Sequence, residues 1–438
     1  MEWYFAGLLM LGSLITLMAI GTPVFMAFLI TNAMGVFVFF GFREASLEQL
    51  AANASASITS FVLVPVPLFV LMGELFFHTG LAVKVFDAFD KLIGRVPARL
   101  SYIAVGSGTV FATLTGTSVG SAAMMGSMLV PEMDRRGYKK HMSIGPIMGA
   151  GGLAILIPPS ALAVLLGSIA RIDIGSLLLA GVIPGVLLAL LYAGYIFAQA
   201  KLDPDAAPIY AVDESTLGEK LRVLVVDILP MILVILMVIA LIIFGIATPT
   251  ESAAFGVLGV VVLALLKGRL DWPSIVASMK GTIKISTMLL IIIVGSSTFS
   301  QIIAFSGSSQ GLLAFTAGLD WGPMAMLLAM FAVLLFLGMF LDQISQMMLT
   351  IPIFMPIAMG AGFDPVWFGI VVLLAMEISL LTPPFGLLLF VMMGSAPKGT
   401  TMTTIVKSAV PYMGCALLLL LLLIIWPELA LWLPSTMR

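Results

Sequence analysis

Long apolar segments fill most of this chain and are separated by short polar stretches. About 20 helical residues are needed to cross roughly 30 Å of hydrocarbon, and most of these segments approach or exceed that length. A soluble core cannot bury so many of them, so the pattern predicts an all-α polytopic membrane protein. The segments cover residues 4–21, 23–40, 58–78, 102–131, 143–170, 176–199, 224–246, 249–266, 285–304, 323–356, 366–394 and 405–432.

The same pattern occurs twice along the chain. The prolines that interrupt it recur at an offset of 225 to 227 residues, close to half the chain length, which we call the repeat offset. Duplicated halves with broken helices at matching places are typical of transporter binding sites. The four matches, in order, are Thr22-Pro23 with Thr248-Pro249, Pro131 with Pro356, Pro158-Pro159 with Pro383-Pro384, and Pro184 with Pro411.

A polar linker at residues 200–222 separates the two halves, 1–199 and 223–438, and is rich in acidic residues. Basic residues predict how the halves are oriented. Segment 102–131 has lysines and arginines on both sides, whereas the whole stretch 285–397 contains neither lysine nor arginine. By the positive-inside rule, 102–131 leaves and re-enters the cytoplasmic side, and 323–356 enters from the opposite side.

The prediction is therefore inverted structural repeats with about ten spans, two re-entrant hairpins (102–131 and 323–356), two broken helices (143–170 and 366–394) and a periplasmic N-terminus. Residues Phe77 to Val96 have helical amphipathic spacing and are expected to form an interfacial arm helix or a surface connector.

Composition narrows the possible functions further. Hydrophobic residues make up 61% of the 438 residues, charged residues make up 10%, and the mean hydropathy is +1.19. A net charge of −2 gives no indication of a nucleic-acid partner. The single cysteine, Cys415, excludes an internal disulfide and a cysteine-built metal site. The N-terminus lacks the basic region of a cleaved signal peptide, so we expect the first apolar segment to be retained.

Each predicted hairpin has a polar cluster near its midpoint, at residues 113–121 and 338–346. Non-helical backbone at membrane depth persists only where it lines a cavity or is buried in protein. Hydroxyl groups and free carbonyls in such clusters are suitable oxygen ligands for Na⁺. The alternative for the first cluster is that Gly116 and Gly120, spaced GxxxG, only allow close helix packing.

The two double prolines are expected to unwind their helices, because each proline removes an amide donor and restricts the residue before it. Unwinding exposes carbonyls such as those of Ile157 and Thr382, and the following half-helix begins with a positive dipole end that favours an anion. A simple proline kink is the alternative at either place.

Asp342 and Glu377 lie in the stretch without lysine or arginine and are functional candidates, because an unpaired carboxylate is costly inside a membrane. Glu74 and Glu251 are weaker candidates. The alternative for Asp342 is a neutral acid that caps the hairpin helix.

These motifs together resemble the large permease subunit of tripartite ATP-independent periplasmic (TRAP) transporters. They run in family order over essentially the whole chain: PLFVLMG at 67–73, RGY at 136–138, IPPS at 157–160, GIATPTESAA at 245–254, GMFLD at 338–342 and LTPPFG at 381–386. Many relatives have a Ser-Gly-Ser-Ser-like first hairpin tip, where this chain has Thr115-Gly116-Thr117-Ser118.

The resemblance implies an elevator-type ion-transporter fold and import of a small organic anion, a carboxylate such as a C4-dicarboxylate or sialic acid, or a sulfonate. It implies Na⁺ coupling, a separate small membrane subunit, a periplasmic substrate-binding protein and the bacterial inner membrane. It places Na⁺ ligands at Thr115, Gly116, Ser118, Gly152 and Ile157, and at Gly338, Asp342, Thr382 and Pro383. We expect substrate contacts at Thr117, Ser118, Pro159, Ser160, Gln343 and Pro384.

The sequence leaves two alternative functions to consider. A stand-alone Na⁺/dicarboxylate symporter or ion carrier of the same superfamily would need no binding protein. An intramembrane enzyme is disfavoured, because the chain has no HExxH motif and only two histidines, neither of them near a serine motif. The expectation is a transporter subunit and not an enzyme.

Overall fold

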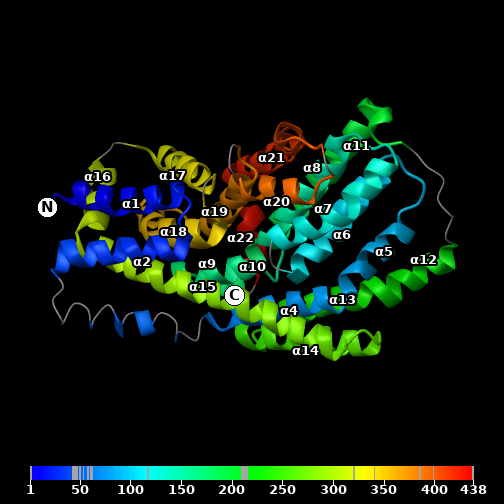
Figure 1. Cartoon of the computed structure of the whole chain (residues 1–438), viewed down its shortest axis with the longest axis horizontal. Coiled ribbons are helices and arrows are strands. Elements are labelled where there is room, and N and C mark those ends of the chain that lie inside the picture. Colours follow the sequence, from blue (N-terminus) through cyan, green and yellow to red (C-terminus); the bar gives the residue numbers. More distant parts are fainter. Residues whose placement is uncertain are drawn as a thin grey trace.

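In the computed structural model, the described part of the chain is helical and contains no strand. The structure describes residues 2–41, 48, 51–52, 54–56, 59, 63–115, 118–208, 216–318, 321–339, 341–383, 386–397 and 399–436. Figure 1 shows an elongated molecule, with the N-terminus at one end and the C-terminus near the middle.

The first half of the chain contains a helical hairpin and a broken helix. Its helices are α1 (Trp3–Ala19), α2 (Val24–Gly35), α4 (Pro65–His78), α5 (Leu81–Leu92), α6 (Arg99–Thr115), α7 (Ser118–Arg135), α8 (Lys140–Gly152), α9 (Ala161–Ala170), α10 (Ile174–Ala180) and α11 (Val182–Leu202). The pair α6/α7 is the hairpin, and α8 followed by α9 is the broken helix.

The second half repeats this order. Its helices are α12 (Leu217–Val223), α13 (Leu229–Ile243), α14 (Pro249–Leu266), α15 (Trp272–Phe305), α16 (Ser308–Gly318), α17 (Pro323–Gly338), α18 (Gln343–Gly360), α19 (Pro365–Leu380), α20 (Leu387–Ser395), α21 (Met402–Ile425) and α22 (Glu428–Ser435). Here α17/α18 is the hairpin and α19/α20 is the broken helix.

Several elements differ from the sequence prediction, among them α15, which begins at Trp272 and so extends well before the predicted segment 285–304. Helix α16 lies where no element was expected, and the repeat offset relates its first residue to the first residue of α5, so the two helices are counterparts. Residues 200–222 are partly helical, because α11 continues to Leu202 and α12 begins at Leu217 behind a capping box of Thr216 and Glu219. The last predicted segment is divided, since α21 ends at Ile425 and α22 begins at Glu428.

The first broken helix is interrupted where its sequence disfavours an α-helix. Helix α8 ends at Gly152, a 3₁₀ turn covers Leu153–Ile155, and α9 begins only after the two prolines. Ser160 caps α9, and its hydroxyl oxygen accepts a hydrogen bond from the Ala163 amide at 3.2 Å. This cap satisfies one of the free amides that the break creates.

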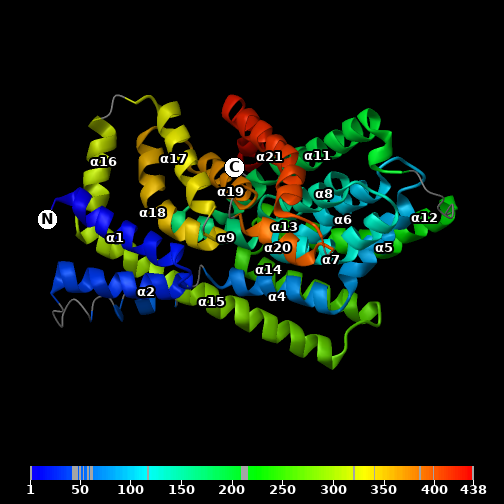
Figure 2. The ribbon, with the colours of Figure 1, turned by 45° about the horizontal axis from the view of Figure 1, so that its top comes forward.

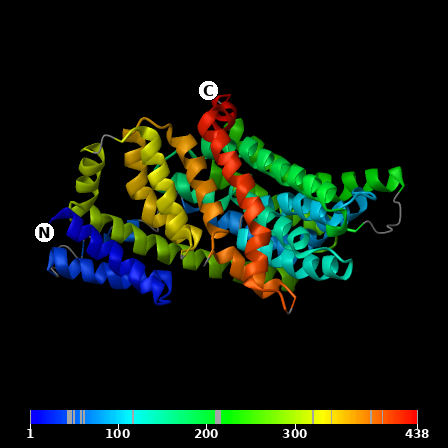
Figure 3. The ribbon, with the colours of Figure 1, turned by 90° about the horizontal axis from the view of Figure 1, so that it is seen from above.

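Helices α1, α2, α4, α14 and α15 form a layer along one side of the molecule, which we call the scaffold layer (Figure 2). Asn32 joins α2 to α15 by donating to the Gly295 carbonyl at 2.7 Å. The rings of Phe28 and Phe299 meet edge to face in the same contact, with centroids 5.6 Å apart. The hairpins and broken helices lie against this layer and form the group that we call the hairpin group (α6–α9 and α17–α20), whose second half is seen beside α21 in Figure 3.

Helix α5, the predicted arm, is bent by 64° from α4. Its inner face is buried at Leu81, Ala82, Val85 and Ala88. Arg99, at the start of α6, forms an ion pair with Asp90 at 2.9 Å. The arm therefore packs against the first hairpin.

Six helical runs in the described residues are long and apolar enough to cross a membrane. They are Ile174–Leu202, Leu217–Ile243, Pro249–Leu266, Trp272–Phe305, Gln343–Gly360 and Met402–Ile425. Shorter apolar helices include Pro323–Gly338 and Pro365–Leu380. The chain is thus an all-helical polytopic membrane protein, and the count of about ten spans stays a prediction.

Cysteine labelling tests the predicted inversion of the two hairpins. In a Cys415→Ser background, Arg135→Cys marks the base of the first hairpin and Gly360→Cys the base of the second. Arg135 is 79% exposed, and nothing lies within 4 Å of a Cβ at Gly360, so both positions accept a thiol. We expect a membrane-impermeant maleimide to label Arg135→Cys only from the cytoplasm and Gly360→Cys only from the periplasm. Labelling of both from one side contradicts the inversion.

Candidate functional site

The two hairpins meet at one buried carboxylate, that of Glu377 in α19. Its side chain is completely buried, with 0% of its surface exposed. Ser118, the first residue of α7, donates its hydroxyl to Glu377 Oε2 at 3.1 Å. Gln343, the first residue of α18, donates Nε2 to the same oxygen at 3.3 Å. Hydrogen bonds to one oxygen thus join the tips of two hairpins from opposite halves of the chain.

Glycine is required where the first broken helix passes this carboxylate. A Cβ at Gly152 would overlap the carboxyl group of Glu377, and one at Gly151 would come within 3.1 Å of the Ser118 carbonyl oxygen. The absence of side chains allows the end of α8 to touch both the hairpin tip and Glu377. Two predicted ligands, Ser118 and Gly152, are therefore brought together.

The second hairpin packs on its own broken helix through a different set of contacts. A Cβ at Gly338 would overlap the side chain of Ser379. Ser379 donates its hydroxyl to Gln346 Oε1 at 3.2 Å, and Gln346 in turn donates to the Leu334 carbonyl. This network ties α17, α18 and α19 together near the tip.

Asp342 is the N-cap of α18. Its carboxylate accepts the backbone amides of Ile344 at 3.0 Å and Ser345 at 3.2 Å, and also the Ser345 hydroxyl. All three partners are donors, so the groups around it suit a carboxylate that only accepts. The helix dipole also favours an acidic side chain at this position.

The other predicted residues lie at varying distances from these contacts. Thr382 donates its hydroxyl to the Ile378 carbonyl at 2.8 Å, and no hydrogen bond among the described residues joins it to Asp342. Pro383 follows it in the break after α19. Ile157 is buried against Gly185, and Pro159 faces α10 and α13. Gly116, Thr117 and Pro384 lie outside the described residues, as does the side chain of Thr115.

A cavity of about 430 Å³ lies between the hairpin tips and the scaffold layer. Val66 and Val70 of α4 and Met288 of α15 contribute to its apolar wall. The opposite wall is built from the first turns of four helices: Ser118 and Gly120 of α7, Ala161 and Leu162 of α9, Gln343 and Ile344 of α18, and Leu387 of α20. Helix N-termini carry a partial positive charge, so the starts of α7, α9 and α20 in this wall favour a negatively charged group, whereas the first amides of α18 already bond to Asp342.

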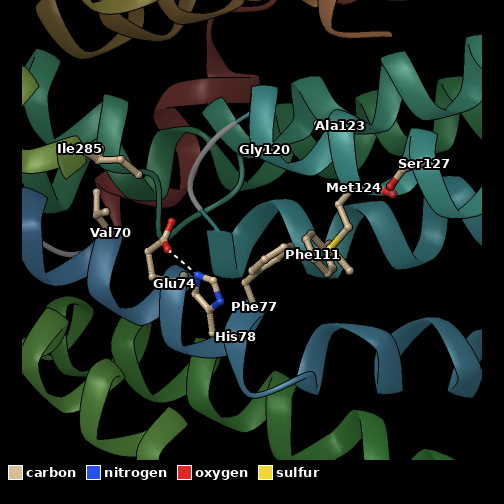
Figure 4. Close-up of a pocket in the computed structure, with 11 residues that line it drawn as sticks. Val70, Glu74, Phe77, His78, Phe111, Gly120, Ala123, Met124, Ser127 and Ile285 are labelled. Carbon is tan, nitrogen blue, oxygen red and sulfur yellow. Dashed lines mark hydrogen bonds and ion pairs between the residues drawn. The ribbon is translucent and has the colours of Figure 1, made fainter. Parts of the chain in front are cut away.

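A second cavity of about 460 Å³ continues from the first along α7, and both are lined by Gly120 and Glu74 (Figure 4). It extends past Phe111 and Met124 to Ser127. Glu74 lies at the junction and pairs with His78, with 3.2 Å between Oε2 and Nε2. The carboxylates in the described walls are thus Glu74, which faces both cavities, and Asp342, which faces the first.

Sequence reasoning named Glu377 as a candidate but assigned it to neither ion site, and it did not single out Ser379 or Gln346 as site residues. The repeat offset contained one indication that these residues belong together. The offset that matches Pro131 with Pro356 also matches Gly152 with Glu377 and Ser118 with Gln343. Equivalent residues of two related halves meet only near the axis that relates them. The offset alone does not say which pairs lie there.

Gly152→Ala tests the close approach of α8 to Glu377. The added methyl group must displace the carboxylate, and overpacking of this kind costs about 1–3 kcal/mol. We expect a large loss of transport together with a lower melting temperature of the purified protein. Gly194→Ala is the matched control, because Gly194 is an exposed helical glycine with nothing within 4 Å of its Cβ. Equal transport by the two variants would show that Gly152 has no special role.

Comparison with known proteins agrees with this architecture. The chain is 30% identical to the C4-dicarboxylate TRAP transporter large permease protein DctM of Pseudomonas aeruginosa, over 90% of this chain and 91% of the relative. It is 28% identical to the ectoine TRAP transporter large permease protein TeaC of Halomonas elongata, over 97% and 98% of the two chains. It is 27% identical to the sialic acid TRAP transporter large permease protein SiaM of Vibrio cholerae, over 90% and 91%.

Among solved structures, the fold is similar to that of the Alcanivorax borkumensis YdaH transporter, with a TM-score of 0.61, 13% identity and 90% coverage of both chains. The structure of Neisseria gonorrhoeae MtrF matches with a TM-score of 0.59 and 15% identity, over 88% of this chain and 83% of that one. The sequence profile of the tripartite ATP-independent periplasmic transporter, DctM component, covers residues 11–429. The chain therefore belongs to the DctM family, the large permease subunits of TRAP transporters.

Proposed function

We propose that this chain is the transport subunit of a bacterial inner-membrane importer that moves a small organic anion with a Na⁺ gradient by an elevator mechanism. It works with a small membrane subunit and receives substrate from a periplasmic binding protein. The cavity walled by the first turns of four helices is the observation that carries this proposal.

The cavity suits an anion although none of its described lining residues is a lysine or arginine. An ammonium or guanidinium group inside a membrane is costly, whereas the N-terminal amides of helices offer partial positive charge without a buried ion. Its apolar scaffold wall can cover the carbon skeleton of a small substrate. A carboxylate or sulfonate at the hairpin tips is the arrangement that these walls favour.

The substrates after which the three relatives are named have this chemistry. They are C4-dicarboxylates, ectoine and sialic acid, each with at least one carboxylate group. We infer the same substrate class for this chain.

Na⁺ coupling is supported by the way each hairpin tip packs on a broken helix. Ser118 and Gly152 both contact Glu377 beside the first tip, and Gly338 and Ser379 meet near the second. Hydroxyls and backbone carbonyls are concentrated at these two contacts, and they are the oxygen ligands that a hard cation prefers. Binding of an ion at either contact would hold hairpin and broken helix together and so complete the cavity wall.

The adjacency of the two cavities, which share Gly120 and Glu74 in their walls, supports an elevator state that is open to the cytoplasm. The second cavity lies along α7, which ends at Arg135, and beside His78 at the end of α4. The positive-inside rule places both ends in the cytoplasm. Movement of the hairpin group along the apolar scaffold wall would then carry the substrate site to the other face.

Uptake into proteoliposomes tests the proposed function. With the large subunit, the small subunit and the cognate binding protein all present, we expect substrate uptake to fall by at least about tenfold when a K⁺ gradient replaces the Na⁺ gradient, because the driving force is lost. Uptake that ignores Na⁺ contradicts the coupling. Undiminished uptake without the binding protein would instead identify a stand-alone symporter.

Ser118→Ala and Thr382→Ala test the two ion sites. Loss of one oxygen ligand should raise the Na⁺ concentration for half-maximal uptake by about tenfold, which corresponds to about 1.4 kcal/mol. Thr400→Ala is a control, since Thr400 lies in the loop before α21. Wild-type Na⁺ dependence in both site variants would refute the assignment.

A further inference from the structure

Glu377 occupies a special position between the two halves of the chain. The residues that donate to its Oε2, Ser118 and Gln343, are related by the repeat offset. Gly152, which packs against the same carboxylate, is related to Glu377 itself by that offset. Gly152 and Glu377 also stand at the same distance before the first proline of their respective pairs. One acid therefore serves equivalent positions of both halves at the place where the halves meet.

Among the described residues, only one oxygen of this carboxylate has a hydrogen-bond partner. Both hydrogen bonds go to Oε2, whereas Oε1 is buried without a hydrogen-bond partner in the described residues. Oε1 points at the backbone of Gly152, where a Cβ would overlap it. A buried acceptor of this kind is costly unless something binds it.

The charge of Glu377 also lacks a counter-charge in the described part of the protein. No ion pair among the described residues includes it, and it lies within the stretch 285–397, which contains no lysine or arginine. Two neutral donors stabilise a carboxylate only partly, because a buried charge needs an opposite charge nearby. A small cation beside Oε1 would meet both needs.

We propose that Glu377 is a direct ligand, through Oε1, of the Na⁺ ion held by Ser118 and the end of α8. This inference rests on the proposed function, which brings Na⁺ to the first hairpin tip, and it adds a charged ligand to a set of neutral oxygens. Because Oε2 also accepts from Gln343, the position of the second hairpin tip depends on the same ion. Glu377 thereby links the two tips.

The competing role for Glu377 is a neutral hydrogen-bonded connector between the hairpins. Glu377→Gln separates the two roles, because glutamine has nearly the same size and keeps an oxygen that can accept from Ser118 and Gln343. The substitution removes the charge and replaces the oxygen that has no partner in the described residues with an NH2 group, which cannot bind a cation. A connector survives it, and a cation ligand does not.

The experiment measures the melting temperature of the purified membrane complex during a Na⁺ titration, with choline keeping the ionic strength constant. For Glu377→Gln we expect the Na⁺ concentration for half-maximal stabilisation to rise by about tenfold or more. In choline alone its melting temperature should equal or exceed that of the wild type, since an unbalanced buried charge has been removed. Glu428→Gln, the same change at an exposed carboxylate in α22, should behave as wild type.

An unchanged Na⁺ midpoint in Glu377→Gln overturns this proposal and leaves the proposed function standing. Failure of Na⁺ to stabilise the wild type contradicts the proposed function itself. If Glu377→Gln does not fold, electron cryo-microscopy of the wild type in Na⁺ and in choline decides the matter. Density at coordination distance from Oε1 only in Na⁺ supports the proposal, and no difference at that position overturns it.

Discussion

The structure depends on a constraint that the membrane imposes on broken helices. Backbone amides and carbonyls freed inside the hydrocarbon region must find partners within the protein, because lipid offers none. Here the four breaks do not lie apart. Ser118 and Gln343, which begin the second helix of each hairpin, both donate to Glu377 of α19, and the end of α8 at Gly152 packs on the same carboxylate. A single polar interior results, and the cavity lies beside it.

Much of this architecture follows from local sequence. The double prolines fall where α8 and α9, and α19 and α20, are separated, so both breaks follow from local sequence, whereas the hairpins were inferred from polar clusters and flanking basic residues. Helix α16 was missed because its sequence, Ser308–Gly318, is not a long apolar run. The repeat offset would have found it as the counterpart of α5. The helix caps at Asp342 and Ser160 also depend on local sequence, since each side chain accepts hydrogen bonds from amides two or three residues ahead.

The connections across the site were not predictable in the same way. Glu377 and Ser118 are far apart in the sequence, and nothing near either residue indicates the other. The resemblance placed Ser118 and Gly152 in one ion site, and the structure brings them together. The resemblance said nothing of Ser379, which fills the space beside Gly338, or of Glu377 Oε1, which has no hydrogen-bond partner in the described residues. Such contacts depend on how two halves dock, which only the three-dimensional arrangement determines.

The close docking of the two halves explains why one half has Glu377 where the other has Gly152. Two acids at the positions of Gly152 and Glu377 would press like charges together in a space that holds one carboxylate, so the equivalent of an acid must be small. A duplicated chain can therefore have similar hairpin tips in both halves, but it can have an acid at only one of the two positions that meet between them. A ligand shifts a conformational equilibrium only by its differential affinity for the states. Since both tips contact this one group, an ion that binds it favours the state in which both hairpins are closed on their broken helices.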